Sequence, residues 1–134
     1  MSNIATSIEQ SKHLLVLRLD IKSADMCLCK TAQDTWFLCA GTPDEYDAHT
    51  VPAWSLSALL EVMPKEHEPE IQKSPVTGQY FVYGFFDGEK PTYMTKDYDS
   101  PIDAAYEMVC YLLEQGLIEK GEEDEDIQIQ RQRH

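Results

Sequence analysis

Residues 100–116 read Ser-Pro-Ile-Asp-Ala-Ala-Tyr-Glu-Met-Val-Cys-Tyr-Leu-Leu-Glu-Gln-Gly, and they are the most decisive stretch for the fold. Ser100 is a favourable N-cap, Pro101 suits the first helical position, and Asp103 is placed to complete the cap. Gly116 is typical of the left-handed residue that ends a helix. The apolar side chains between these ends recur at helical spacing, at Ile102, Ala105, Tyr106, Val109, Leu112 and Leu113. The stretch therefore predicts a helix with one buried face.

The segment before this helix predicts a β-hairpin. Residues 79–86 are strongly aromatic, as expected for a strand. The dipeptide Asp87-Gly88 is a turn signal. Residues 91–95 form the returning strand, and Pro91 places it at a sheet edge or at a strand start.

The first half of the chain shows a similar sequence of elements. Capping residues and apolar spacing predict a helix over residues 7–19, and residues 54–63 predict a second helix that Pro64 ends. Between them lie two expected strands, 26–30 and 35–39, while 65–78 are read as a polar loop. The order α-β-β-α-β-β-α predicts the α+β class, an antiparallel sheet of about four strands covered by three helices. The two α-β-β units suggest an internal duplication of architecture.

The domain boundary is expected near residue 118. A chain of 134 residues is near the common size of one domain, so residues 1–118 are interpreted as a single α+β domain. Residues 119–134 contain five consecutive acids, Glu122 to Asp126, and predict a flexible acidic tail.

Charge and hydropathy limit the partners. The net charge is −13, which disfavours direct contact with nucleic acid and with anionic membranes, and favours a partner protein with a basic surface. No apolar run approaches the length of a membrane span, and the N-terminal residues lack the pattern of a secretory signal. We therefore expect a cytoplasmic protein.

Three stretches resemble a family of uncharacterised small proteins encoded by prophages and mobile elements of gut Bacteroidetes. They are residues 7–12 (SIEQSK) with 24–26 (ADM), residues 52–64 (PAWSLSALLEVMP) and residues 100–114 (SPIDAAYEMVCYLLE). The resemblance covers the three expected helices. It implies an accessory protein of a phage or mobile element, and it implies no activity.

The residues predict neither a catalytic group nor a cofactor. Cys27 and Cys29 are separated by one residue within an expected strand, whereas structural zinc sites usually use a wider spacing on a turn. They are therefore interpreted, with Cys39 and Cys110, as reduced thiols in largely apolar surroundings, and no metal site is expected. The histidines form no paired motif, and the sequence contains no nucleophile elbow or glycine-rich phosphate loop.

The aromatic residues are the feature most suggestive of function. Alternation places Phe81, Tyr83 and Phe85 on one face of their strand. The sheet is either packed on both faces, or it exposes a patch that binds a partner protein or a second copy of the chain. The residues assigned to this patch are Trp36, Trp54, Tyr80, Tyr83, Phe85 and Tyr93.

The first hypothesis for function is a non-enzymatic protein-interaction protein. The alternative is a small-ligand-binding domain or small enzyme, with a pocket near the second helix lined by Trp54, His49 and Asp47. A self-assembling structural subunit is the third hypothesis.

Overall fold

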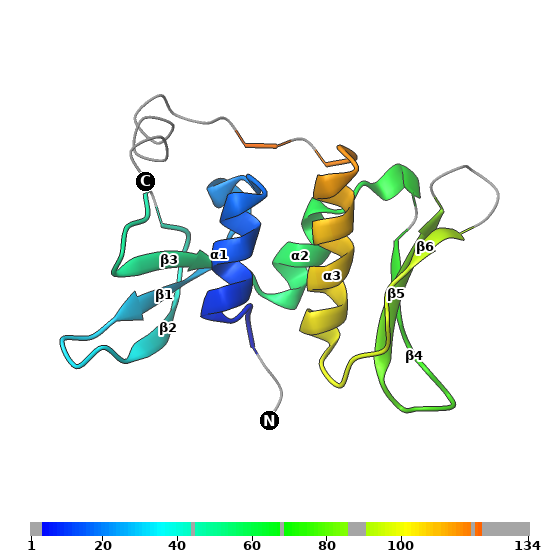
Figure 1. The fold of residues 1–134 in the computed structure, drawn as a ribbon, viewed down its shortest axis with the longest axis horizontal. Helices are drawn as coiled ribbons and strands as arrows, with labels where there is room; N and C mark the ends of the chain where they lie inside the picture. The colour runs from blue at the N-terminus through cyan, green and yellow to red at the C-terminus, as the bar shows by residue number, and fades with distance from the viewer. Residues whose placement is uncertain (1–3, 44, 68, 86–90, 119, 122–134) are drawn as a thin grey trace.

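A computed structural model describes residues 4–43, 45–67, 69–85, 91–118 and 120–121 of the chain. Within these residues the main elements follow the order α-β-β-β-α-β-β-β-α (Figure 1). The elements are α1 (Ile8–Val16), β1 (Met26–Lys30), β2 (Trp36–Ala40), β3 (Thr50–Ala53), α2 (Leu56–Val62), β4 (Glu70–Lys73), β5 (Tyr80–Phe85), β6 (Pro91–Met94) and α3 (Pro101–Glu114). The α+β class is confirmed.

The strands form two separate antiparallel sheets in the described part of the chain, not one sheet of about four strands. The first sheet has the order β2-β1-β3 and the second the order β4-β5-β6. The helices lie between the two sheets (Figure 1). Helix α1 packs against β3, and α3 packs against both α2 and β5. A duplication of architecture would give the two sheets the same strand order, and their orders differ. The central strand of the first sheet is β1, the first of its three strands along the chain, whereas the central strand of the second sheet is β5, the second of its three.

Two strands were missed for identifiable reasons. Strand β3 contains Pro52, which cannot donate to a strand ladder, but β3 is an edge strand and tolerates it. Strand β4 is almost entirely polar and lies within the predicted loop of residues 65–78. It is also an edge strand, and Ile71 is its single large apolar side chain. An edge strand that buries one side chain gives almost no alternating signal.

Helix α3 forms the centre of the molecule. Ser100 is its N-cap and accepts a hydrogen bond from the backbone of Ile102, and Pro101 is its first residue. Gly116 has φ 73° and lies at C′, as predicted. Asp103 instead accepts a hydrogen bond of 2.8 Å from the Gln10 side chain and so ties α3 to α1.

Helix α3 is buried on more than the predicted stripe. It contributes eight buried residues, which are Ile102, Ala104, Ala105, Met108, Val109, Cys110, Leu112 and Leu113. A helix that contacts both another helix and a sheet needs apolar side chains over a wider arc than a surface helix does.

Helix α1 ends three residues earlier than predicted. Arg18 adopts φ 71°, a left-handed conformation that ends the helix. The Arg18 backbone N–H then donates to the Leu15 carbonyl, and the Leu19 backbone N–H donates to the Leu14 carbonyl. Both hydrogen bonds are 3.0 Å long and form a Schellman motif. Leu19 is thereby turned into the core, where its side chain is 4% exposed.

The start of the predicted acidic tail lies against the end of α1. The Gly121 N–H donates to the Arg18 carbonyl at 2.9 Å, and the Arg18 guanidinium donates to the Gly121 carbonyl at 3.3 Å. The remainder of the predicted tail, residues 122–134, lies outside the described residues.

Candidate functional site

The aromatic residues assigned to one patch are distributed over three parts of the molecule. Trp54 lies between β3 and α2 and is fully buried, at 0% exposure. Its indole N–H donates a hydrogen bond of 2.9 Å to Ser23. Trp54 is therefore a core residue, and a partner cannot reach it.

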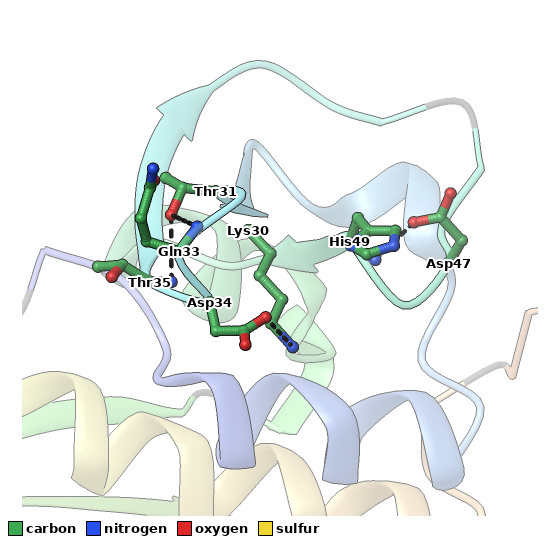
Figure 2. Close-up of polar contacts among 7 residues, drawn as sticks. All are labelled: Lys30, Thr31, Gln33, Asp34, Thr35, Asp47 and His49. Carbon is green, nitrogen blue, oxygen red and sulfur yellow. Dashed lines mark hydrogen bonds and ion pairs between the residues drawn. The ribbon is translucent and has the colours of Figure 1, made fainter.

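Trp36 lies on the first sheet, away from the other aromatic residues of the predicted patch. Its half-buried ring packs against the core, and the ammonium groups of Lys12 and Lys30 lie 6.0 and 5.7 Å from the ring centroid. Lys30 also forms an ion pair of 3.4 Å with Asp34 at the tip of the β1–β2 hairpin (Figure 2). Trp36 therefore stabilises the junction between α1 and the first sheet.

Tyr80 and Tyr93 face the helices from the second sheet. The Tyr93 ring stacks on Tyr111 of α3, with centroids 3.7 Å apart and planes at 9°. The Tyr93 hydroxyl donates to Glu107 at 2.9 Å, and Tyr98 donates to the other oxygen of this carboxylate at 2.6 Å. These contacts attach the second sheet to α3.

The environment of these hydroxyl groups opposes their ionisation. Burial, followed by the hydrogen bond to Glu107, raises the pKa of Tyr93 to about 12. For Tyr98, the hydrogen bond to Glu107 is the larger cause and burial the second, and its pKa is also about 12.

The outer face of the second sheet carries an apolar stripe. Phe81 and Tyr83 point to the opposite side of β5 from Val82, which is fully buried, and their ring centroids lie 6.1 Å apart. Met94 of β6 pairs with Tyr83 and is 57% exposed. Among the described residues no helix covers this side of the sheet, because α3 packs on the other one (Figure 1). We call Phe81, Tyr83 and Met94 the aromatic face. Phe85 has the same parity on β5, but its side chain is outside the described set.

Polar side chains from β4 border the aromatic face. Glu70 pairs with Tyr83 across the strands and accepts a hydrogen bond of 2.6 Å from its hydroxyl. Gln72 donates to the same hydroxyl at 3.2 Å. The Glu70 hydrogen bond raises the pKa of Tyr83. The predicted patch includes neither Met94 of the aromatic face nor Glu70 at its border, because Met94 is not aromatic and β4 lies within the predicted loop of residues 65–78.

The loop residues considered for a pocket are occupied in backbone contacts. The Asp47 carboxylate accepts from the backbone N–H groups of His49, at 2.7 Å, and Thr50, at 2.9 Å. Figure 2 shows Asp47 and His49 together on the loop before β3. Both are exposed. Asp47 thus shapes the loop, and with Trp54 buried these residues do not converge on a cavity.

A different hollow lies near the second helix. It has a volume of about 460 Å³ and lies where the ends of α1 and α2 meet the segment after α3. Its lining residues are Leu19, Asp20, Ser23, Val62, Pro64, Glu66, Leu117 and Ile118. The lining is largely apolar, with two carboxylates and one hydroxyl.

Three of the four cysteines converge on the first sheet. The Sγ atoms of Cys27, Cys29 and Cys39 all lie within 4.8 Å of one another, and those of Cys27 and Cys29 are 3.8 Å apart. All three side chains are half-buried. Burial is the main cause that raises the pKa of Cys29 and Cys39. Cys110 is buried on α3, where burial raises its pKa to about 11.

Comparison with protein-family models, with curated proteins and with solved structures finds no match to this chain. None of the described helices is long and apolar enough to cross a membrane.

Proposed function

We propose that this chain is a non-enzymatic protein-interaction protein that binds a basic partner protein through the aromatic face. The observation that carries the proposal is the stripe of Phe81, Tyr83 and Met94 on a sheet side that no described helix covers. In its biological setting we propose an accessory protein of a phage or mobile element, acting on a host protein in the bacterial cytoplasm.

The chemistry of the aromatic face suits protein binding. Tyrosine, phenylalanine and methionine are enriched at the centres of protein interfaces. Tyr83 offers a large ring that is already oriented by Glu70 and Gln72, so little side-chain freedom remains to be lost on binding. Met94 is flexible and adapts its shape to a partner.

The charge of the chain supports a basic partner. A net charge of −13 accelerates encounter with a positive surface and repels nucleic acid. Glu70 places one of these charges at the border of the aromatic face. A partner with an apolar centre and a surrounding ring of Lys or Arg would match both features.

The test is affinity capture from a lysate of bacterial host cells with nuclease added, using wild type and two variants. Met94→Glu adds a charge to the aromatic face, whereas Val76→Glu adds the same charge in the turn between β4 and β5, where Val76 is 90% exposed. We expect one host protein to be retained by wild type and Val76→Glu at low salt, released at high salt, and lost with Met94→Glu. Equal capture by all three proteins, or an empty capture at low salt, contradicts the proposal.

Self-association at the same face is a separate outcome of this test. Light scattering over a range of concentrations measures the molecular mass of wild type and Met94→Glu. A dimer that only wild type forms would assign the aromatic face to a second copy of the chain, and would replace the host partner in the proposal.

The hollow near α2 supports small-ligand binding as the second candidate. Its apolar lining and the polar groups of Asp20, Ser23 and Glu66 suit a small ligand with a cationic group. A thermal-shift screen of small amines distinguishes the two candidates, since a stabilising ligand whose effect is lost in Glu66→Gln and retained in Met94→Glu would favour the hollow.

A further inference from the structure

The three cysteines of the first sheet are brought together by strand register. Cys27 of the central strand β1 pairs directly with Cys39 of β2, and paired residues of antiparallel strands point to the same side. Cys29 follows Cys27 at a spacing of two residues and shares that side. The side is opposite to the one that bears Trp36 and Val51, which pack toward the core.

The distances fit one metal ion. Zinc binds thiolate sulfur at about 2.3 Å, so two sulfurs of a tetrahedral site lie about 3.8 Å apart. The Cys27 and Cys29 sulfurs already have this separation, 3.8 Å. The Cys39 sulfur lies within 4.8 Å of both, so it would have to approach by at most about 1 Å to reach the sulfur separation of a tetrahedral zinc site.

The surroundings permit entry of an ion. Cys29 pairs with Phe37 on one side and Thr50 on the other, and Phe37 is 48% exposed. Cys27 lies between Cys39 and Pro52, which is fully buried. The sulfurs thus have a closed side and an open side, and the open side leaves room for a ligand from solvent.

The donor set selects the class of ion. In the described part of the chain, no histidine or carboxylate joins the three sulfurs. Thiolates prefer soft ions such as Cu⁺ and Zn²⁺ over Mg²⁺ or Ca²⁺. Three sulfurs also exceed the two that one disulfide would use. A disulfide would leave the third sulfur unpaired, whereas one metal ion uses all three.

We propose that Cys27, Cys29 and Cys39 together bind one soft metal ion, Zn²⁺ or Cu⁺. Each thiol releases its proton to solvent as its sulfur–metal bond forms, so three protons leave for each ion bound. Zn²⁺ takes a water molecule as fourth ligand on the open side, whereas Cu⁺ is satisfied by three sulfurs. The site is independent of the aromatic face, which lies on the other sheet.

The test uses the full-length chain, reduced and free of oxygen, with Zn²⁺ and Cu⁺ added separately. Native mass spectrometry counts bound ions, and competition with a chelator of known affinity gives the dissociation constant. Co²⁺ serves as a spectroscopic probe, because thiolate ligands give it an intense charge-transfer band. We expect one ion per chain and the thiolate band.

Variants separate this site from adventitious binding. In Cys39→Ser we expect the metal affinity to fall by more than about 100-fold. The loss of a ligand should exceed the roughly 10- to 100-fold loss that follows when only a hydrogen-bond partner of a ligand is changed. Cys110→Ala removes the one cysteine outside the cluster and keeps wild-type affinity. Circular dichroism confirms that both variants fold. Unchanged affinity in Cys39→Ser, equal loss in Cys110→Ala, or no stoichiometric binding of either ion overturns the proposal.

Discussion

Thr6 joins the beginning of the chain to the core, and its removal gives the most quantitative prediction. Its hydroxyl accepts a hydrogen bond of 3.0 Å from the Trp54 backbone N–H and shares one of 2.8 Å with Ser11. Thr6 is 2% exposed and Ser11 0% exposed. Water therefore cannot replace either contact when the hydroxyl is lost.

The substitution Thr6→Val keeps the shape of the side chain and removes the hydroxyl. The Trp54 N–H is then buried without this acceptor, which costs about 1–3 kcal/mol. The Ser11 hydroxyl loses its partner as well and adds about 1 kcal/mol. We expect the free energy of unfolding to fall by about 2–4 kcal/mol, a large share of the stability of a small domain.

Urea titration followed by circular dichroism measures this loss as a lower midpoint with an unchanged slope. The double variant Thr6→Val with Ser11→Ala should recover about 1 kcal/mol, because the second unpaired hydroxyl is also removed. Thr35→Val is the matched control, since Thr35 is exposed and its loss should stay within about 0.5 kcal/mol. A Thr6→Val midpoint equal to that of the control would refute the reasoning.

Three further predictions concern particular residues. Gly116→Ala should lower the free energy of unfolding by about 1 kcal/mol. The cause is backbone strain at φ 73° and not a steric clash, since an added Cβ would meet no atom within 4 Å. Gly116→Asn should cost less in the same urea assay, because asparagine adopts the left-handed conformation more readily than alanine. The stability contributed by Tyr93 and Tyr98 should be complete below pH 10 and be lost as the pH rises from 10 to 12, because both hydroxyls hold their protons more tightly in the folded state. Over that range the fall in urea midpoint should be shallower in the double variant Tyr93→Phe with Tyr98→Phe than in wild type. The fluorescence of Trp36→Phe should resist quenching by acrylamide, because the remaining Trp54 is fully buried, and strong quenching would contradict its placement.

The helices and the hairpin of β1 and β2 were predictable because their signals are local. Ser100, Pro101 and Gly116 mark the ends of α3 by their own backbone chemistry. The division into two sheets was not predictable in the same way. This division depends on β3 and β4. Each of them is identified as a strand by its pairing, β3 with β1 and β4 with β5, and not by a pattern in its own residues. Pairing between distant segments leaves little trace in a polar edge strand.

The candidate sites show the same limit. Alternation placed Cys27 and Cys29 on one side of a strand, but the approach of Cys39 follows from the register of the β1–β2 hairpin. For the aromatic residues, residue type alone did not distinguish Trp54, which is buried between β3 and α2, from Tyr83, which lies on the outer side of β5. Burial of an aromatic ring depends on which neighbour covers it, and that is decided by the three-dimensional arrangement.

Among the described residues, the edge strands of the two sheets differ in how they would meet a neighbouring chain in a concentrated solution. Strand β3 contains Pro52, β6 begins with Pro91, and β4 carries charged side chains, all of which hinder the addition of a further strand. Strand β2, Trp-Phe-Leu-Cys-Ala, has neither proline nor charge. Aggregation of the folded protein should therefore begin at β2, and a lysine introduced at Phe37 would be the first change to make for long-term storage.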